Sequence, residues 1–215
     1  MMGLLLVEPV IQELRMPPGI AGPGEVAFDV RCFLVSHQAG LLVVDAGPMG
    51  SAGAIGSVLD RVGAGWGDIT DVVLTHAHPD HVGGLGELAD RSPGAAIWAG
   101  TADCRGIRSA VPLRPLLEGD SVRSLQVLHT PGHTAGHISL LHGDGILFVG
   151  DAVGTVAGAM RRAPEPFTAD AAEAELSLRR LSRLEPDRMV FSHGPEIPDP
   201  VGALRRLLDV APGAP

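Results

Sequence analysis

Short apolar runs, each ended by a polar or glycine-rich break, recur along the whole chain. Residues 3–14 alternate loosely between apolar and polar positions and predict a first strand. Residues 28–36 and 41–45 predict a hairpin that turns at residues 38–40. Further strands are predicted at residues 71–74, 95–98, 121–130, 138–141, 146–149 and 188–192. Runs this short, mixed with helical segments, are typical of an α/β protein.

Helical spacing appears in four segments between these strands. The first places apolar side chains three and four residues apart, which predicts an amphipathic helix packed on a sheet. The third begins with acidic residues and ends with arginines, an order that complements the helix dipole. The predicted helices span residues 51–62, 85–88, 169–184 and 201–210.

Length, composition and charge limit the kind of protein. The chain has 215 residues with 45% apolar content, which is enough for a large core in one domain or two tightly fused halves. Its net charge is −9, so a nucleic-acid backbone is not an expected partner. No apolar run is long enough for a membrane helix, and the first residues lack the basic flank of a signal peptide. We expect a soluble cytoplasmic protein that does not bind membranes.

The two cysteines agree with this location, because Cys32 and Cys104 fit a reducing compartment. Cys32 lies in a strand-like run and is interpreted as a small buried hydrophobe. Neither residue occupies a predicted ligand position.

The densest chemistry follows the apolar run at 71–74. His76 and His78 are two residues apart and so face the same side of an extended segment, where they can bind one ion. A proline then turns the chain, which directs Asp80 and His81 toward a second position. Four ligands do not complete two coordination spheres, so further ligands are expected elsewhere. The alternative interpretation is a histidine-rich surface loop or a helix cap.

Three later segments place a possible ligand directly after a predicted strand. These ligands are His133, Asp151 and His193. Asp45 is one more carboxylate at a strand terminus, and it either orients a ligating histidine or caps a turn.

With these segments, the chain resembles the metallo-β-lactamase superfamily. The resemblance rests on H-x-H-x-D-H at residues 76–81, P-G-H-T-x-G-H at 131–137, G-D at 150–151 and S-H-G at 192–194. It implies a four-layered αβ/βα sandwich with two pseudo-symmetric halves, residues 1–118 and 119–215. We expect residues 1–215 to form a single domain of this fold.

The resemblance also implies a ligand set. One metal would be bound by His76, His78 and His133, and the other by Asp80, His81 and His193, with Asp151 bridging the two. Two Zn²⁺ ions per chain are expected, with Fe²⁺ or a mixed Fe/Zn pair as the alternative. Asp45 is expected to orient a ligand histidine or its loop. The remaining histidines are expected to be structural or exposed, namely His37, His129, His137 and His142.

In function, the chain is similar to glyoxalase II, which implies a dinuclear metal-dependent hydrolase of small thioesters or ester-like compounds. A metal-activated water is the expected nucleophile, and Asp80 is the candidate proton shuttle. One alternative is a lactone or β-lactam hydrolase, although class B β-lactamases lack the bridging Asp151. The other alternative is a mononuclear iron persulfide dioxygenase with only His76, His133 and Asp151 as ligands.

Substrate specificity is expected to reside in proline- and glycine-rich segments at residues 16–25, 105–117 and 152–168, which are interpreted as surface loops. Of these, the last follows the bridging carboxylate and offers arginines for a substrate carboxylate, although they could equally be solvated. The candidate substrate contacts are Met16, Arg161, Arg162 and Phe167. Hydroxyacylglutathione hydrolases of standard length add a C-terminal helical region, and too few residues follow the last predicted helix for it.

Overall fold

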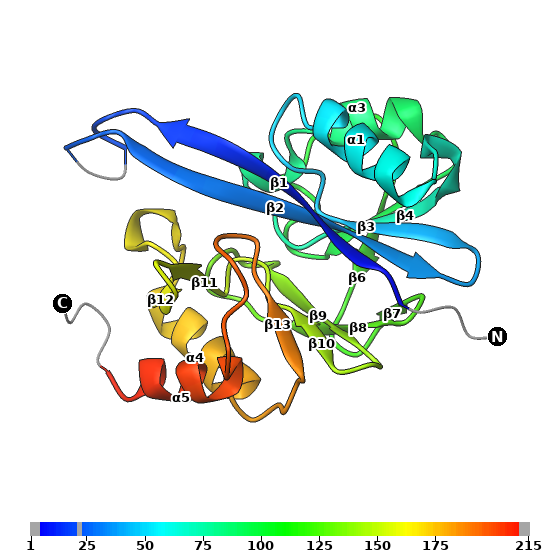
Figure 1. Ribbon diagram of the computed structural model, residues 1–215. Helices are drawn as coiled ribbons and strands as arrows, with labels where there is room; N and C mark the ends of the chain where they lie inside the picture. The colour runs from blue at the N-terminus through cyan, green and yellow to red at the C-terminus, as the bar shows by residue number, and fades with distance from the viewer. Residues whose placement is uncertain (1–4, 21–22, 211–215) are drawn as a thin grey trace.

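The computed structural model describes residues 5–20 and 23–210 (Figure 1). A six-stranded sheet is formed by the first half of the chain, in the order β1-β2-β3-β4-β5-β6. Its first three strands are antiparallel, and β3 to β6 run parallel. The strands are β1 (Val7–Met16), β2 (Val26–His37), β3 (Gly40–Val44), β4 (Ile69–Leu74), β5 (Ala96–Gly100) and β6 (Leu113–Leu116).

A second sheet of five strands is formed by the other half, in the order β13-β10-β9-β8-β7. Its strands are β7 (Ser121–Val122), β8 (Leu125–His129), β9 (Ile138–His142), β10 (Ile146–Phe148) and β13 (Arg188–Val190). A separate two-stranded sheet consists of β11 (Val153–Val156) and β12 (Ala159–Arg162). The predicted boundary between the halves, at residues 118 and 119, therefore falls between the two large sheets.

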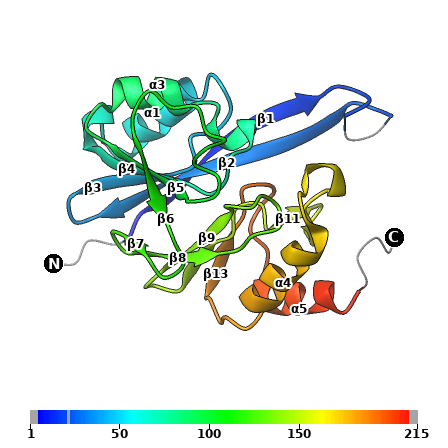
Figure 2. The same ribbon diagram turned by 180° about the vertical axis from the view of Figure 1, so that it is seen from behind.

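Helices cover the outer face of each sheet. Figures 1 and 2 show α1 and α3 on the six-stranded sheet, and α4 and α5 on the five-stranded one. The helices are α1 (Ala52–Val62), α2 (Pro79–Val82), α3 (Leu85–Arg91), α4 (Ala171–Leu181) and α5 (Pro200–Leu208), with short 3-10 turns η1 (Trp66–Asp68) and η2 (Glu165–Phe167). Asp170 caps α4 by accepting bonds from the amides of Ala172 and Glu173.

Successive side chains of the strands point to opposite faces of the sheets, and together they form three apolar layers. In β2, Cys32 and Leu34 pack under α1, whereas Phe33 and Val35 point into the layer between the sheets. Strands of the second sheet alternate in the same way between the central layer and the layer under α4 and α5. Since successive side chains of a strand face opposite sides, fully apolar runs are what a sheet covered on both faces requires. The predicted four-layered αβ/βα sandwich is thus confirmed.

Several predicted boundaries are wrong. Met16, predicted to be irregular, ends β1, and residues 3, 4, 21 and 22 lie outside the described residues. The segment 105–117 contains β6, an edge strand that tolerates Pro115 because one side of the strand is unpaired. The strand predicted at 121–130 is a hairpin instead, with Arg123 in the left-handed region at φ 56°.

The segment 152–168, predicted as a loop, also contains regular structure. Ala157 and Gly158 both have positive φ, which is the conformation of a tight turn between antiparallel strands. This turn joins β11 to β12, and only the part after β12 remains irregular apart from η2. Among residues 5–20 and 23–210, no helix is both long and apolar enough to cross a bilayer.

Candidate metal centre

The predicted ligands lie where strands of both sheets end. His76 and His78 follow β4, and the next residues start α2, where Asp80 and His81 occupy the first turn after Pro79. The other three follow strands of the second sheet: His133 comes after β8, Asp151 after β10 and His193 after β13. The fold therefore gathers seven side chains that are up to 117 residues apart in sequence (193 − 76).

These side chains form two groups. The ligand-capable atoms of His76, His78 and His133 lie within 4.8 Å of one another, and we name this group the first cluster. The same limit holds for Asp80, His81 and His193, which we name the second cluster. Four imidazoles of the two clusters are within reach of one carboxylate, that of Asp151.

Asp151 lies between the two clusters. Its Oδ2 is 3.4 Å from His133 Nε2 and 3.8 Å from His76 Nε2 in the first cluster. On the other side, Asp151 is 3.1 Å from His193 Nε2 and 3.3 Å from His81 Nε2. A carboxylate that lies between two groups of imidazoles can bridge two neighbouring cations.

Buried polar atoms without hydrogen-bond partners identify what the centre can bind. Such atoms are costly in a protein interior unless something satisfies them. Five of them converge here: His76 Nε2, His81 Nε2, His133 Nδ1, His133 Nε2 and Asp151 Oδ1. Imidazole nitrogens and a carboxylate oxygen are the ligands preferred by zinc and similar divalent ions. The residues present therefore fit a metal.

The two clusters differ in charge. Burial, followed by the neighbouring imidazoles, holds the pKa of His76 well below its ordinary value and also lowers the pKa of His78. In the second cluster, burial acts in the same direction, but the carboxylate of Asp151 outweighs it and raises the pKa of both His81 and His193. Burial disfavours the Asp151 carboxylate, yet His81 and His193 keep the pKa of Asp151 well below its usual range.

Asp45 makes the contact expected of an orienting carboxylate. It is buried after β3 and has φ 62°, an unusual conformation for a residue other than glycine. Its Oδ2 lies 2.9 Å from His81 Nδ1, which leaves Nε2 free to bind a cation. It also accepts bonds from the amide and hydroxyl of Thr75, and that hydroxyl is 3.0 Å from His76 Nδ1. Asp45 thus contacts one cluster directly and the other through Thr75.

His137 is not in either cluster, in agreement with the expectation that it is not a ligand. Its Nδ1 donates to Thr130, and its Nε2 accepts from the backbone N–H of Asp151 at 3.0 Å. Complete burial lowers the pKa of His137 to about 3. The neutral ring therefore holds the backbone of the central carboxylate.

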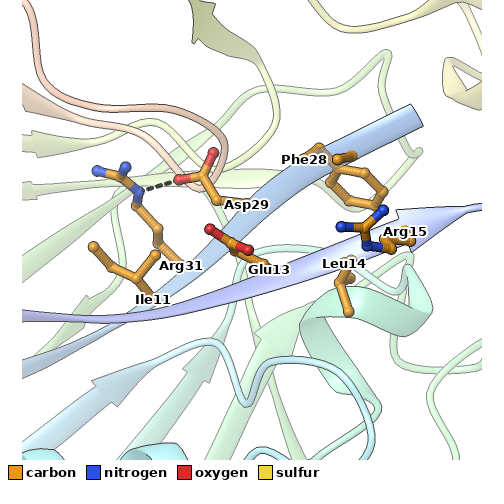
Figure 3. A pocket seen from close by; sticks show the side chains of 8 residues that line it. Ile11, Glu13, Leu14, Arg15, Phe28, Asp29 and Arg31 are labelled. Carbon is orange, nitrogen blue, oxygen red and sulfur yellow. Dashed lines mark hydrogen bonds and ion pairs between the residues drawn. The ribbon is translucent and has the colours of Figure 1, made fainter. Parts of the chain in front are cut away.

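In the second cluster, His193 is held by β2, although β2 and His193 belong to different halves of the chain. The carbonyl of Asp29 is 2.7 Å from His193 Nδ1, and its Oδ1 accepts from the Gly194 amide. Phe28 places its ring 5.6 Å from that of His193, centre to centre. Phe28 and Asp29 also line a hollow of about 700 Å³ along the β1–β2 ribbon, and Figure 3 shows their side chains there. Asp29 also binds the Arg31 guanidinium at 2.6 Å, so β2 links the hollow to the second cluster.

The candidate substrate contacts are not brought together in the same way. Arg162 forms a two-bond ion pair with Glu175 of α4 and also donates to the Val210 carbonyl. Its guanidinium is therefore engaged within the fold, and its contact with a substrate carboxylate stays a prediction. Arg161 is exposed, and its Nη1 donates to the Met160 carbonyl. Met16 and Phe167 are half-buried, and their contact with substrate stays a prediction.

The histidines outside the centre have structural contacts. His37 was expected to be solvent exposed, but it is half-buried and lies 2.9 Å from Thr70 Oγ1, because β3 and β4 pack beside it. His142 accepts from the Asp144 amide within the β9–β10 turn, and His129 lies near the Ala135 carbonyl.

Two carboxylates near the centre escaped the sequence analysis, namely Asp29 and Asp103. Asp29 lies inside a strand, where no motif distinguishes it from a surface residue. Asp103 lies in an irregular segment, and its side chain accepts bonds from Ala77, Thr134 and Gly136. No spacing in the sequence indicates either contact, because the partners are distant along the chain.

Comparison with solved structures agrees with this architecture. The hydrolase AbOPH of the beta lactamase superfamily aligns with a TM-score of 0.71 at 20% identity, covering 91% of this chain and 89% of that one. The protein TTHA1623, solved in a di-iron-bound form, aligns with a TM-score of 0.68 at 26% identity, covering 90% of this chain and 98% of that one.

Sequence relatives lead to the same family. Hydroxyacylglutathione hydrolase of Aeromonas salmonicida (strain A449) is 35% identical over 167 residues, which are 76% of this chain and 60% of the relative, so the chain spans only part of that protein's length. The uncharacterized protein YobT of Bacillus subtilis (strain 168) is 28% identical and is covered over 91% of its length. A family model described as the metallo-beta-lactamase superfamily matches residues 26–193. The chain belongs to the metallo-beta-lactamase superfamily.

Proposed function

We propose that this protein is a two-ion, metal-dependent hydrolase of the glyoxalase II type. The first cluster would hold one ion, the second cluster the other, and Asp151 would bridge them. The observation that supports this most strongly is the convergence of buried nitrogens without hydrogen-bond partners around the carboxylate of Asp151, where four imidazoles of the two clusters lie within 3.8 Å. A proton on His133 Nε2 could be shared with Asp151, 3.4 Å away, but His76 Nε2 is 3.8 Å from that carboxylate, too far for a hydrogen bond.

Two divalent ions would supply an activated water as nucleophile and polarise the substrate carbonyl. The residues of the chain then have separate tasks. Asp151 separates the ion positions, and Asp45 keeps His81 in the tautomer that exposes Nε2. Asp80 is the proton carrier that we favour, because its carboxylate is 25% exposed while that of Asp151 is 10% exposed. A proton taken up by Asp80 can therefore leave to solvent.

The complete second cluster favours two ions over one. A mononuclear iron dioxygenase would need His76, His133 and Asp151 alone, and it would have no use for Asp80, His81 and His193 at mutual distances within 4.8 Å. We favour zinc because imidazole nitrogens and carboxylate oxygens suit its tetrahedral or five-coordinate shell. Iron is the alternative, since the relative TTHA1623 is found in a di-iron-bound form.

We further propose a small thioester or ester-like substrate. The name of the Aeromonas relative supports an acyl-glutathione type of thioester, although the match covers only 60% of that protein. The hollow beside Phe28 and His193 offers about 700 Å³ for the remainder of such a molecule. Its lining combines apolar side chains with two arginines and two carboxylates, and both arginines are ion-paired, Arg15 with Glu25 and Arg31 with Asp29, so the hollow favours no particular charge on the substrate.

The setting of the enzyme is part of the same proposal. We infer one domain for residues 1–215, because the central apolar layer draws on strands of both sheets, such as Phe33 and Phe148. A reducing, cytoplasmic location is supported by the free thiols of Cys32 and Cys104. A small molecule, rather than nucleic acid, is the partner that a net charge of −9 favours.

The test is metal content by mass spectrometry on protein purified without added metal, combined with turnover of a glutathione thioester. We expect two ions per chain and turnover that a chelator abolishes and zinc restores. A lactone of similar size is the comparison substrate, and faster lactone turnover would replace the thioester assignment. One iron per chain with oxygen consumption and no hydrolysis would contradict the proposed function.

A further inference from the structure

Asp103 lies in a tight segment after β5, between the two loops that carry the first cluster. Its side chain is buried, with the residue only 6% exposed. We propose that Asp103 is a positioning residue, which joins these loops and thereby sets the affinity of the first cluster for its ion. The inference rests on the proposed function only in requiring that the first cluster binds a metal.

Three hydrogen bonds support this role, and all of them end on the loops in question. Asp103 Oδ2 accepts from the backbone N–H of Ala77 at 2.9 Å, and Ala77 stands between His76 and His78. The same oxygen accepts from Thr134 Oγ1 at 2.6 Å, and Thr134 directly follows His133. All three ligands of the first cluster are thus adjacent in sequence to a group bound by one carboxylate.

The third bond extends the contact into the second sheet. Asp103 Oδ1 accepts from the Gly136 amide at 2.7 Å, and Gly136 precedes β9. Asp103 and Ala77 belong to the half that forms the six-stranded sheet, whereas Thr134 and Gly136 belong to the other half. The carboxylate therefore links the two halves of the molecule at the point where the first cluster is assembled from both.

The backbones around Asp103 and Gly136 pack closely. A side chain at Gly136 would overlap the backbone and carboxylate of Asp103, and one at Gly100 would overlap the carbonyl of Gly136. The absence of a Cβ at both positions lets the backbones touch. The Asp103 carboxylate can therefore lie directly against the 134–136 segment while it also binds Ala77.

The chemistry explains why a carboxylate is required. An ionised carboxylate accepts three bonds from N–H and O–H donors, and such bonds are stronger than neutral ones. An asparagine has one accepting oxygen, and its NH₂ group would face either the Gly136 amide or the Ala77 amide. Asp103→Asn should therefore release one of the two loops without removing any buried volume.

The experiment measures metal binding by each cluster separately, in variants that lack one ligand of the other cluster. In a His193→Ala background only the first cluster is complete, and in a His133→Ala background only the second. Co²⁺ affinity is titrated in both against a chromophoric chelator, with and without Asp103→Asn. We expect Asp103→Asn to weaken the first cluster on the order of 10- to 100-fold, as loss of an outer hydrogen-bond partner typically does, and to leave the second unchanged. Thr134→Val, which removes one of the three bonds, should give a smaller effect in the same direction.

Asp71→Asn is the matched control. Asp71 is also a buried carboxylate with three donors, from Thr70, Trp98 and Arg123, but it lies near the start of β4. The Asp71→Asn substitution should lower the urea midpoint for unfolding of the metal-free protein without changing its Co²⁺ affinity. The inference is overturned if Asp103→Asn keeps the parent affinity of the first cluster, or if Asp71→Asn weakens that cluster equally. A parent protein that binds no Co²⁺ would overturn the inference and the proposed function together.

Discussion

The first and second clusters use similar side chains in opposite electrostatic settings. In the first, imidazoles surround one another, and burial lowers the pKa of His76 and His78. In the second, carboxylates raise the pKa of His81 and His193 against the effect of burial. Burial therefore favours neutral imidazoles at His76 and His78, ready for a cation, whereas His81 and His193 favour protons that a cation must displace.

The clusters also differ in how they are supported. The first is assembled from loops of both halves, and Asp103 connects those loops without contacting a ligand side chain in the described structure. The second is oriented directly at the ligand rings, by Asp45 on His81 and by the Asp29 carbonyl on His193. The centre is therefore supported in two ways. Hydrogen bonds place the loops of the first cluster, whereas hydrogen bonds to the imidazole rings orient the ligands of the second.

The strongest test removes what the clusters share. Asp151→Ala should abolish binding of the second ion, weaken the first and reduce turnover at least about 1,000-fold, since several kcal/mol of charge stabilisation would be lost. Metal content and kcat/KM on the best substrate are the measurements. A variant that retained both ions and full turnover would exclude Asp151 as the bridge.

A pair of single-ligand variants tests whether the clusters are separate sites. His133→Ala should leave one ion in the second cluster, and His193→Ala should leave one in the first, because each retains the other cluster intact. Metal content measured after gel filtration should fall from two ions to one in both variants. Loss of both ions from either variant would show that the clusters form a single cooperative unit.

The smallest expected effect comes from Asp45→Asn. Asparagine tolerates the left-handed backbone at this position, with φ 62°, so the fold should be retained. Because Asp45 contacts the His81 ring directly but His76 only through Thr75, the second ion should weaken by about 10- to 100-fold and the first by less. Metal titration at constant pH checks this order, and His142→Ala, outside both clusters, should bind both ions with parent affinity. A larger loss at the first ion would reverse the assignment.

Much of the fold was predictable because local pattern specified it. The strands β2, β3, β9 and β10 and the helix α1 were expected close to their observed positions, since apolar runs and helical spacing are local signals. Strand β6 was missed because Pro115 argues against a strand, and only its edge position makes the proline tolerable. The ion pair between Arg162 and Glu175 was not predictable, because Glu175 lies on another element.

The amino-acid sequence alone specifies which ligand types are available and that each ligand segment follows an apolar strand. It also specifies a fold of the metallo-beta-lactamase family. These features can be recognised in short segments, because the residues that form each motif are two to five positions apart. Only the tertiary structure decided which carboxylates support which ligands. Asp103 meets Thr134 across 31 residues and Asp29 meets His193 across 164, so both contacts depend on how the two sheets pack against each other. Hydrogen-bond partners that packing brings together leave no periodicity in the sequence. The residues that support the metal ligands are therefore visible only in the tertiary structure.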